Sequence, residues 1–321
     1  MANKKVVVIG GGHGQSAILR GIKNIDNIDI SAIVTVADDG GSTGRLRQQF
    51  HIPAMGDIRN VMLALAESES LLSTLMDYRF KSNENPDEED VDVQGHNLGN
   101  LILTALTESC GSFMEAISTV SKVLRVKGVI IPATLQVISL YAVMEEGTIV
   151  KGEANIPTFD NRIQRVFYQD DVKATPQAIK AIAEADLIIY GIGSVYTSIL
   201  PNIIIPQIRE ALKQANGKKV YFCNAMSQPG ETDNYTMEDH VNALLEHGAP
   251  VDEVVVASDP IPDKIVQRYL DQKSTIVRIA QSSHPYKVRM ASLLNFDRQL
   301  VRHDSGKIRA VTEQLVWELE K

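Results

Sequence analysis

A β-branched stretch that runs directly into a cluster of glycines most constrains how this chain can fold. Residues 4–9 read as a strand buried on both faces of a parallel sheet. Glycines then occupy four of the positions 10–14, and residues 15–25 repeat apolar side chains at helical spacing. A strand, a glycine turn and a helix in this order are typical of doubly wound α/β proteins. We therefore expect a mostly parallel, Rossmann-like sheet.

The same alternation of strands and helices continues along the chain. A second buried strand is expected over 28–37, and it leads into another glycine-rich segment at 38–45. Further helices are predicted over 56–67, 71–78, 101–109, 113–124, 177–184, 202–215 and 237–247, and further strands over 186–190, 219–223, 254–257 and 275–279.

The segment 127–169 departs from this pattern. Two short strands, 137–144 and 148–153, flank a Glu-Gly turn, which predicts an antiparallel hairpin. We therefore expect a small β lobe over 127–169, inserted into one Rossmann-like nucleotide-binding domain made of 1–126 and 170–321.

Composition excludes several classes of protein. The chain has 321 residues, 44% of them hydrophobic, which is enough for a large core and rules out general disorder. A net charge of −8 argues against non-specific nucleic-acid binding, and an acidic run at 84–92 reads as a solvated surface loop. The first apolar run is too short for a signal peptide, and no run is long enough to span a membrane. We expect a cytoplasmic homo-oligomer with two reduced cysteines.

The first glycine turn predicts a phosphate site. Glycines at 11, 12 and 14 let a ligand approach the backbone, and the following helix start offers free N–H groups to anionic oxygens. Residues 12–17 also satisfy the G-x-G-x-x-A dinucleotide fingerprint, so an NAD- or FAD-dependent enzyme remains an alternative. The next acid at a strand end, Asp38, comes 26 positions after Gly12, later than a ribose-binding acid at about 20.

Carboxylates near the second glycine turn are candidate metal ligands. Asp38, Asp39 and Asp57 together could hold Mg²⁺ beside a diphosphate. Carboxylates also cap helices, however, and Asp57 lies at an expected helix start. The arginines at 45, 47 and 59 have the planar geometry that matches phosphate oxygens, although each could be a plain surface charge.

Other polar loops extend the predicted site. His96, Asn97 and Asn100 belong to the first turn of a helix, where they could meet an anion, although a lone histidine is more often a core residue. No Walker lysine follows the glycine turns, and Ser194 does not lie in a G-x-S-x-G elbow. An ordinary P-loop ATPase and a serine hydrolase are therefore not expected.

These loops resemble the family of 2-phospho-L-lactate transferases and gluconeogenesis factors. Nearly the whole chain takes part, through the segments 8–12, 36–47, 56–60, 95–100, 193–198 and 228–233. The runs Ala-Asp-Asp-Gly-Gly-Ser and Gln-Pro-Gly-Glu-Thr-Asp look like the gluconeogenesis-factor branch of Gram-positive bacteria. The chain departs from that branch at His13, at Asn97-Leu98 and at Ile192, where threonine, a serine-aromatic pair and proline are usual.

The resemblance implies two alternative functions. The gluconeogenesis-factor branch is associated with growth on gluconeogenic carbon and with cell shape, and it implies a regulatory protein that binds UDP-sugars such as UDP-N-acetylglucosamine. The transferase branch implies a metal-dependent enzyme that moves a phospholactyl group onto a deazaflavin. A sensor would return its ligand unchanged, whereas a transferase would turn it over.

From the loops and the resemblance together, we predict that the phosphates lie against the two glycine turns. Arg302 is predicted to reach the phosphates, and Asn224 and Gln228 to read the uridine and sugar ends with residues 194–198. The predicted metal ligands are Asp38, Asp39 and Asp57. The predicted ligand-binding residues are Gly11, Gly12, His13, Gly14, Asp38, Gly40, Gly41, Ser42, Arg45, Arg59, Asn60, His96, Asn97, Asn100, Gly193, Ser194, Tyr196, Thr197, Ser198, Asn224, Gln228 and Arg302.

Overall fold

A computed structural model describes residues 3–67, 71–81, 93–159 and 161–320. The acidic run at 84–92, which we predicted to be a surface loop, lies outside these residues.

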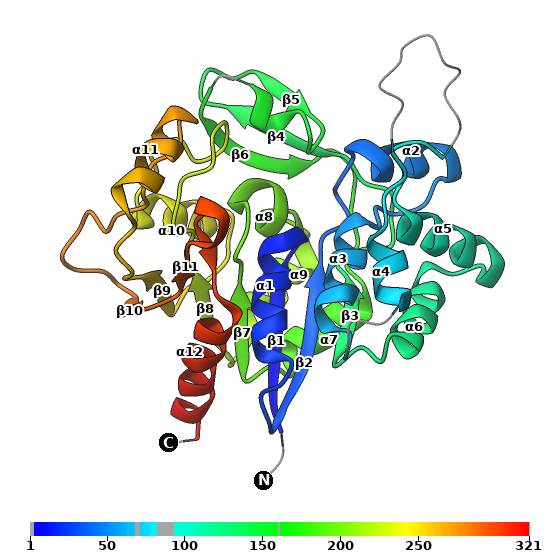
Figure 1. Ribbon diagram of the computed structural model, residues 1–321, viewed down its shortest axis with the longest axis horizontal. Coiled ribbons are helices and arrows are strands. Elements are labelled where there is room, and N and C mark those ends of the chain that lie inside the picture. The colour runs from blue at the N-terminus through cyan, green and yellow to red at the C-terminus, as the bar shows by residue number, and fades with distance from the viewer. Residues whose placement is uncertain (1–2, 68–70, 82–92, 160, 321) are drawn as a thin grey trace.

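The core is a seven-stranded sheet in the order β10-β9-β8-β7-β1-β2-β3, and every neighbouring pair is parallel (Figure 1). This confirms the doubly wound α/β fold. The strands are β1 (Lys4–Gly10), β2 (Ile28–Val34), β3 (Val129–Pro132), β7 (Leu187–Tyr190), β8 (Lys218–Phe222), β9 (Glu253–Ala257) and β10 (Lys287–Ala291).

The strand order reverses beside β1, which pairs with β2 on one side and with β7 on the other. The chain winds outward from β1 to β3 and then returns to β7 to build the second half of the sheet. The loops that leave the carboxyl ends of β1 and β7 therefore diverge, and ligands of open α/β sheets bind in the crevice that such a reversal creates.

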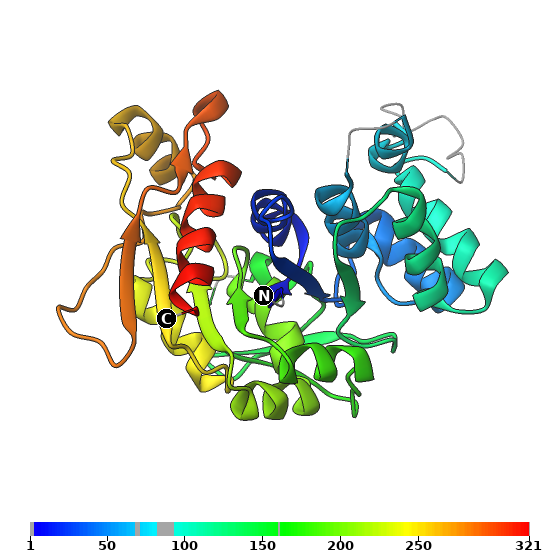
Figure 2. The ribbon, with the colours of Figure 1, turned by 90° about the horizontal axis from the view of Figure 1, so that it is seen from below.

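Helices cover both faces of the sheet (Figure 2). On one face lie α1 (Gly12–Ile22) and α12 (Ser305–Glu318), which pack on each other. The other face carries α7 (Pro176–Ala183), α8 (Leu200–Ile203), α9 (Pro206–Gln214) and α10 (Met237–Glu246). A capping box of Thr236 and Asp239 opens α10 and satisfies two backbone N–H groups at its start.

A group of helices beyond the β2 and β3 side of the sheet carries the loops of the first half. It consists of α2 (Gly41–Phe50), α3 (Gly56–Leu65), α4 (Leu71–Asp77), α5 (Leu98–Cys110) and α6 (Phe113–Val123). Helix α3 packs along α1 and so fixes this group to the sheet. The second glycine turn, which we read as a loop, becomes the first turn of α2.

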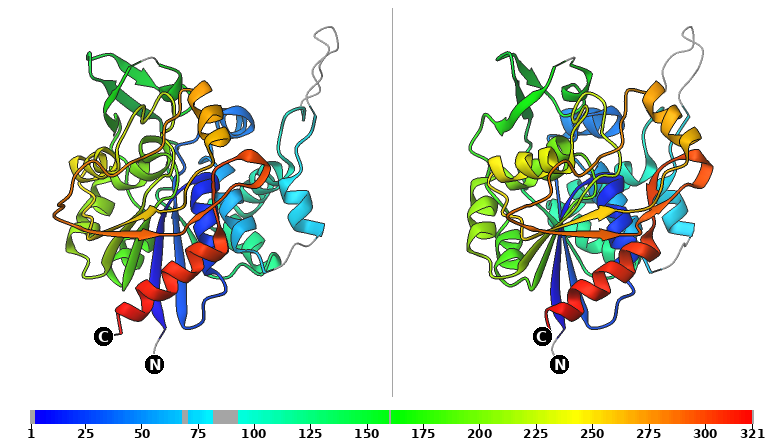
Figure 3. Two further views of the ribbon diagram at one scale, coloured as in Figure 1. Left: turned by 60° about the vertical axis from the view of Figure 1, so that its left-hand side comes forward. Right: turned by 90° about the vertical axis from the view of Figure 1, so that its left-hand side faces the viewer.

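A small antiparallel sheet stands over the carboxyl ends of the parallel strands (Figure 3). It contains β4 (Leu140–Met144), β5 (Ile149–Lys151) and β6 (Ile163–Tyr168), with a short 3₁₀ helix, η1 (Ile156–Thr158), between the last two. The predicted hairpin is therefore present. Strand β3 falls within the range 127–169 expected for this lobe, yet it pairs with β2 in the main sheet.

The last part of the chain differs most from expectation. The strand predicted at 275–279 is wrong: only an isolated bridge joins Met226 to Ile276. The edge of the sheet is instead β10, which the sequence did not reveal because its lysine and arginine break the apolar run. Helix α11 (Asp263–Asp271), the 3₁₀ helix η3 (Asp297–Gln299) and the hairpin of β11 (Leu294–Asn295) with β12 (Arg302–His303) complete this region.

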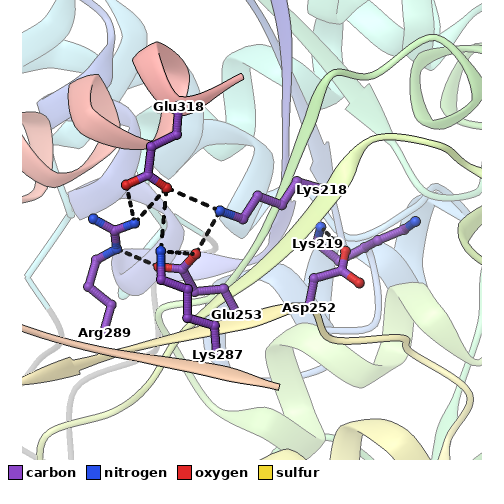
Figure 4. A network of polar contacts seen from close by, with 7 residues as sticks. All are labelled: Lys218, Lys219, Asp252, Glu253, Lys287, Arg289 and Glu318. Carbon is purple, nitrogen blue, oxygen red and sulfur yellow. Dashed lines mark hydrogen bonds and ion pairs between the residues drawn. The ribbon is translucent and has the colours of Figure 1, made fainter. Parts of the chain in front are cut away.

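Charged side chains join the amino ends of three strands to the last turn of α12 (Figure 4). The side chain of Glu253 is fully buried and pairs with Lys218 Nζ at 2.6 Å and with the guanidinium of Arg289. Glu318 of α12 pairs with Arg289 Nη2 at 2.6 Å and with Lys287 Nζ at 3.5 Å. This network lies at the opposite end of the sheet from the crevice, where it holds the carboxyl-terminal helix to β8, β9 and β10.

No helix in the described part of the chain is both long enough and apolar enough to cross a membrane.

Candidate functional site

A cavity of about 340 Å³ lies at the carboxyl ends of β1 and β2, and we call it the central cavity. Four helices, α1, α2, α3 and α5, begin beside it and supply most of its wall. The lobe supplies Glu153, and the loop after β7 supplies Ser198. Among the described residues, the lining consists of His13, Asp38, Gly40, Gly41, Ser42, Thr43, Gly56, Asp57, Arg59, Asn60, Arg79, Asn100, Glu153 and Ser198.

The helix starts make part of this wall electropositive. The first turn of α2 contributes residues 40–43, and no side chain caps it. Gly41 has φ of 45°, a left-handed conformation that glycine adopts without strain. Free N–H groups and the positive ends of helix dipoles favour an anion. The predicted glycine turn after β2 is therefore part of the cavity.

Arg59 of α3 is the most unusual residue in the cavity wall. Its side chain is buried, and Nη2 donates to Asn60 Oδ1 at 2.7 Å. Its Nε and Nη1 atoms, like Asn100 Oδ1, have no hydrogen-bond partner among the described residues. Burial lowers the pKa of Arg59, but a guanidinium remains charged at neutral pH. Buried donors without partners are costly, so the site is prepared for an acceptor that carries negative charge.

Carboxyl groups face this arginine across the cavity. Burial, followed by the charge of Asp38, raises the pKa of Asp57 to about 7. Burial, followed by the charges of Asp38 and Asp57, raises the pKa of Glu153 to about 8. Burial also raises the pKa of Asp38 itself. Carboxyl groups whose pKa values are raised in this way are typical of functional sites.

The first glycine turn makes room for one of these carboxylates. A Cβ on Gly11 would lie 2.4 Å from Asp57 Oδ2, and Gly12 adopts φ of 59° beside the same carboxylate. Gly14 instead packs on the next loop, since a Cβ there would lie 2.2 Å from the Ile192 carbonyl oxygen. The glycines thus serve close packing around Asp57 and the β7 loop as well as any ligand.

The three predicted metal ligands do not converge. Asp38 Oδ1 accepts from Gly40 N at 2.9 Å, and its other oxygen lies close to Gly56. Asp39 turns toward the lobe, where Oδ1 accepts from Ala154 N at 3.0 Å. Among the described residues, no three His, Cys, Asp or Glu side chains are grouped so that they could hold a metal ion by themselves.

The lobe is seated on two loops of the main domain. Asp39 anchors the residues before η1 on the α2 side. On the other side, Gly230 packs on the lobe so closely that a Cβ would lie 1.8 Å from the Pro157 carbonyl oxygen. Glu153, the residue before Ala154, lines the central cavity, so the lobe forms one of its walls.

His96 and Asn97 support the cavity without lining it. Ser42 Oγ accepts from Asn97 N at 3.2 Å and from Asn100 Nδ2 at 3.4 Å, and it lies 3.0 Å from His96 Nδ1. Since a hydroxyl has one proton and both lone pairs are used, Ser42 donates to His96 Nδ1. His96 is then neutral, in agreement with a pKa that burial lowers. Asn97 caps α5 through Asn100 N.

The predicted residues after β7 and β8 are bonded to one another. Buried Glu231 accepts from Ser194 Oγ, from Thr197 Oγ1 at 3.2 Å and from Gln228 Nε2 at 2.5 Å, while burial raises its pKa to about 7. Asn224 closes a pair with Gly193, donating to its carbonyl oxygen at 2.9 Å. Of the loop 194–198, only Ser198 reaches the central cavity.

Three further predicted residues lie outside the cavity wall. Tyr196 meets Tyr235 with their hydroxyl oxygens 2.9 Å apart, below the lobe. Arg45 is exposed and donates to the Gln94 carbonyl oxygen at 2.7 Å. Arg302 is exposed on β12, although its charge is among those that lower the pKa of His13.

Sequence reasoning missed several residues of the site. Thr43 and Gly56 stand next to predicted residues and would have been found by reading α2 and α3 as cavity walls. Glu231 lies within the Gln-Pro-Gly-Glu-Thr-Asp run that carried the resemblance. Arg79 and Glu153 had no such signal, because each reaches the cavity from an element far away in the sequence.

Comparison with known proteins agrees with this architecture. The family model described as 2-phospho-L-lactate transferase CofD matches residues 6–294. A gluconeogenesis factor of Bacillus subtilis is 43% identical over 98% of both chains, and one of Halalkalibacterium halodurans is 47% identical over 85% of this chain and 84% of its own. A crystal structure of a UPF0052 family member from Bacillus halodurans superposes with a TM-score of 0.90 at 42% identity, covering 96% of this chain and 99% of that one.

Proposed function

The chain belongs to the 2-phospho-L-lactate transferase CofD family, with gluconeogenesis factors among its relatives, and from this premise we propose that it binds a nucleotide-sugar as a regulatory protein. The proposed ligand is a UDP-sugar such as UDP-N-acetylglucosamine, with its diphosphate in the central cavity. In this proposal the protein acts in the cytoplasm, as a homo-oligomer, and links ligand level to growth on gluconeogenic carbon and to cell shape.

The buried Arg59 carries the proposal. Arg59 lines a cavity on which the amino ends of four helices converge, and two of its nitrogen atoms have no hydrogen-bond partner among the described residues. Phosphate oxygens satisfy such donors in pairs, because the guanidinium fork matches their spacing. A ribose-binding acid, as in NAD enzymes, is less well supported, since Asp38 turns back onto Gly40 N.

Mg²⁺ fits the site as a companion of the phosphates. The ion usually takes one or two carboxylates and completes its shell with phosphate oxygens and water. Asp38 and Asp57 offer two carboxylates at the cavity, so they replace the predicted set of three. Bound there, the ion would neutralise the charge between carboxylates and phosphates. The same pairing keeps a metal-dependent transferase as the second candidate function.

The first experiment compares ligands by thermal unfolding of the full chain. A ligand that binds only the folded state at about 100 times its dissociation constant stabilises by about 2.7 kcal/mol. We expect UDP-N-acetylglucosamine with Mg²⁺ to raise the melting temperature and NAD to leave it unchanged. Mass spectrometry of the recovered ligand then separates a sensor, which returns it intact, from a transferase. A shift with NAD and none with any nucleotide-sugar would overturn the proposal.

Affinity for the nucleotide-sugar should depend on pH in opposite directions with and without metal. Asp57 and Glu153 are neutral below their raised pKa values of about 7 and about 8 and become anionic above them. Like charges about 4 Å apart repel by roughly 4 kcal/mol at the effective dielectric of a protein site. In EDTA the affinity should therefore fall at least about tenfold from pH 6 to pH 9.

With Mg²⁺ the same ionisation should strengthen binding, because the anionic carboxylates attract the ion. Isothermal titration at each pH measures both series. In Asp57→Asn the ligand affinity measured in EDTA should fall less steeply with rising pH, since one of the titrating groups is gone. Identical pH profiles with EDTA and with Mg²⁺ would contradict the proposed metal.

A further inference from the structure

A second hollow opens beside the central cavity, and we call it the helical groove. Its volume is about 730 Å³, and it shares His13 and Asn60 with the cavity. Three helices, α1, α3 and α4, form its walls together with the residues directly after each of them. The lining is His13, Ser16, Arg20, Lys23, Asn60, Leu63, Ala66, Glu67, Ser73, Thr74, Asp77 and Tyr78. A ligand held in the cavity can therefore extend into the groove past His13 and Asn60.

The groove offers a planar surface and a free guanidinium. Tyr78 exposes 49% of its surface, and Leu63 provides an apolar wall. Arg20 makes no hydrogen bond or ion pair with any described residue. Asp77 adds a carboxylate to the groove, and its charge partly offsets the lowering of the pKa values of His13 and Arg59 by burial. Aromatic rings and guanidinium groups are the surfaces on which nucleobases stack.

The opposite side of the cavity has a different character. Glu153 and Ser198 line it, and both can bond to sugar hydroxyls. The amides that we predicted to read the uridine and sugar ends, Asn224 and Gln228, are already paired with Gly193 and Glu231. The lobe side therefore suits the hydroxylated sugar, whereas the aromatic ring and the guanidinium that suit a base lie in the helical groove.

We infer that the helical groove holds the nucleoside half of the ligand, with the base against Tyr78 and Arg20 and the sugar on the lobe side near Glu153. The inference rests on the proposed function, because it takes the phosphates to occupy the central cavity. It assigns the groove to a hydroxylated, planar, uncharged group that is joined to a diphosphate.

Four probes separate the parts of the ligand: inorganic pyrophosphate, UDP, N-acetylglucosamine 1-phosphate and UDP-N-acetylglucosamine, each titrated with Mg²⁺ into the full chain. Tyr78→Ala removes the ring without changing charge, and Arg20→Ala removes the guanidinium. Arg309→Ala is the matched control, since Arg309 is a half-exposed arginine of α12 whose ion pair within the described part of the chain is with Glu313. Melting temperatures verify that each variant folds.

We expect Tyr78→Ala to lower the affinity for UDP and for UDP-N-acetylglucosamine by about tenfold, because the loss of one stacking contact has about this effect. The affinities for pyrophosphate and for N-acetylglucosamine 1-phosphate should change by less than about twofold. Arg20→Ala should weaken UDP at least about fivefold more than pyrophosphate, and Arg309→Ala should change nothing.

Three results would overturn the inference. If Tyr78→Ala weakens the sugar phosphate and spares UDP, the groove holds the sugar. If all four probes keep their affinities in both groove variants while Arg59→Met abolishes binding, the proposed function stands and the groove has no part in it. If neither pyrophosphate nor UDP-N-acetylglucosamine binds the unmodified chain, the proposed function fails and the inference fails with it.

Discussion

Arg59→Met should reduce the affinity for pyrophosphate and for UDP-N-acetylglucosamine at least about 100-fold. Hydrogen bonds to a charged group contribute about 1.5–3 kcal/mol each, and Arg59 has two buried donors without described partners at the cavity wall. The loss of two such bonds corresponds to about two powers of ten or more. Isothermal titration with each ligand measures it.

The same substitution should leave the free protein as stable as before or make it more stable. A buried charge without its full set of partners opposes folding, and methionine has a similar length without the charge. Urea unfolding without ligand measures this. Arg79→Met is the matched control. Arg79 also lines the cavity but is exposed, so Arg79→Met should reduce ligand affinity less than Arg59→Met does. If Arg59→Met binds pyrophosphate normally, the anion does not occupy these donors.

Glu253→Ala should lower the free energy of unfolding by about 3–5 kcal/mol. That is the usual result when one partner of a buried ion pair is removed and the other charge remains. The Glu253 side chain is fully buried, whereas Lys218 and Arg289 would keep their charges in largely enclosed positions. Urea or thermal unfolding at neutral pH measures the loss.

Two controls separate this effect from function and from surface charge. Glu318→Ala should lower the free energy of unfolding by less than Glu253→Ala does, because 31% of the Glu318 side chain is exposed and solvent screens its ion pairs. Ligand affinity of folded Glu253→Ala should equal that of the unmodified chain, because the network lies at the amino ends of the strands. A loss of stability below about 1 kcal/mol would show that the pairs only offset the cost of their own burial.

The network should also make the fold sensitive to acid. Burial raises the pKa of Glu253, but hydrogen bonds from Arg289 and Lys218 outweigh it and hold the pKa below its usual value. The hydrogen bond from Arg289 lowers the pKa of Glu318 to about 2. Carboxyls of this kind stabilise the fold fully above their unfolded pKa of about 4.3, and the contribution is lost as pH falls through the folded values.

The strands of the main sheet that are continuous apolar runs could be predicted from the sequence. Strands such as β1 and β7 are buried on both faces, so local composition alone reveals them. Strand β10 is different, because its lysine and arginine are satisfied by Glu253 and Glu318 from distant elements. The apolar run at 275–279 was mistaken for a strand, because pairing between strands is a long-range property that local hydrophobicity does not encode.

The sequence predicted those residues of the candidate site that lie just after a strand or at the start of a helix. The glycine turns and Arg59 lie in the loops and helix starts that a doubly wound sheet brings together. Which side chains remain open could not be read from the sequence. Asn224 and Gln228 have suitable chemistry, yet both are paired within the protein. Glu153 joins the cavity only because the lobe folds back over it.

The residues that position the lobe on the main domain differ from the lobe residue that lines the cavity. Asp39 and Gly230 fix where the lobe rests, and neither lines the cavity. Glu153, just before these two contacts, lines the cavity but belongs to no strand of the main sheet. A substitution at Glu153 therefore changes the cavity wall while the seven strands remain as they are, and under the proposed function it would change which sugar is accepted without changing the fold.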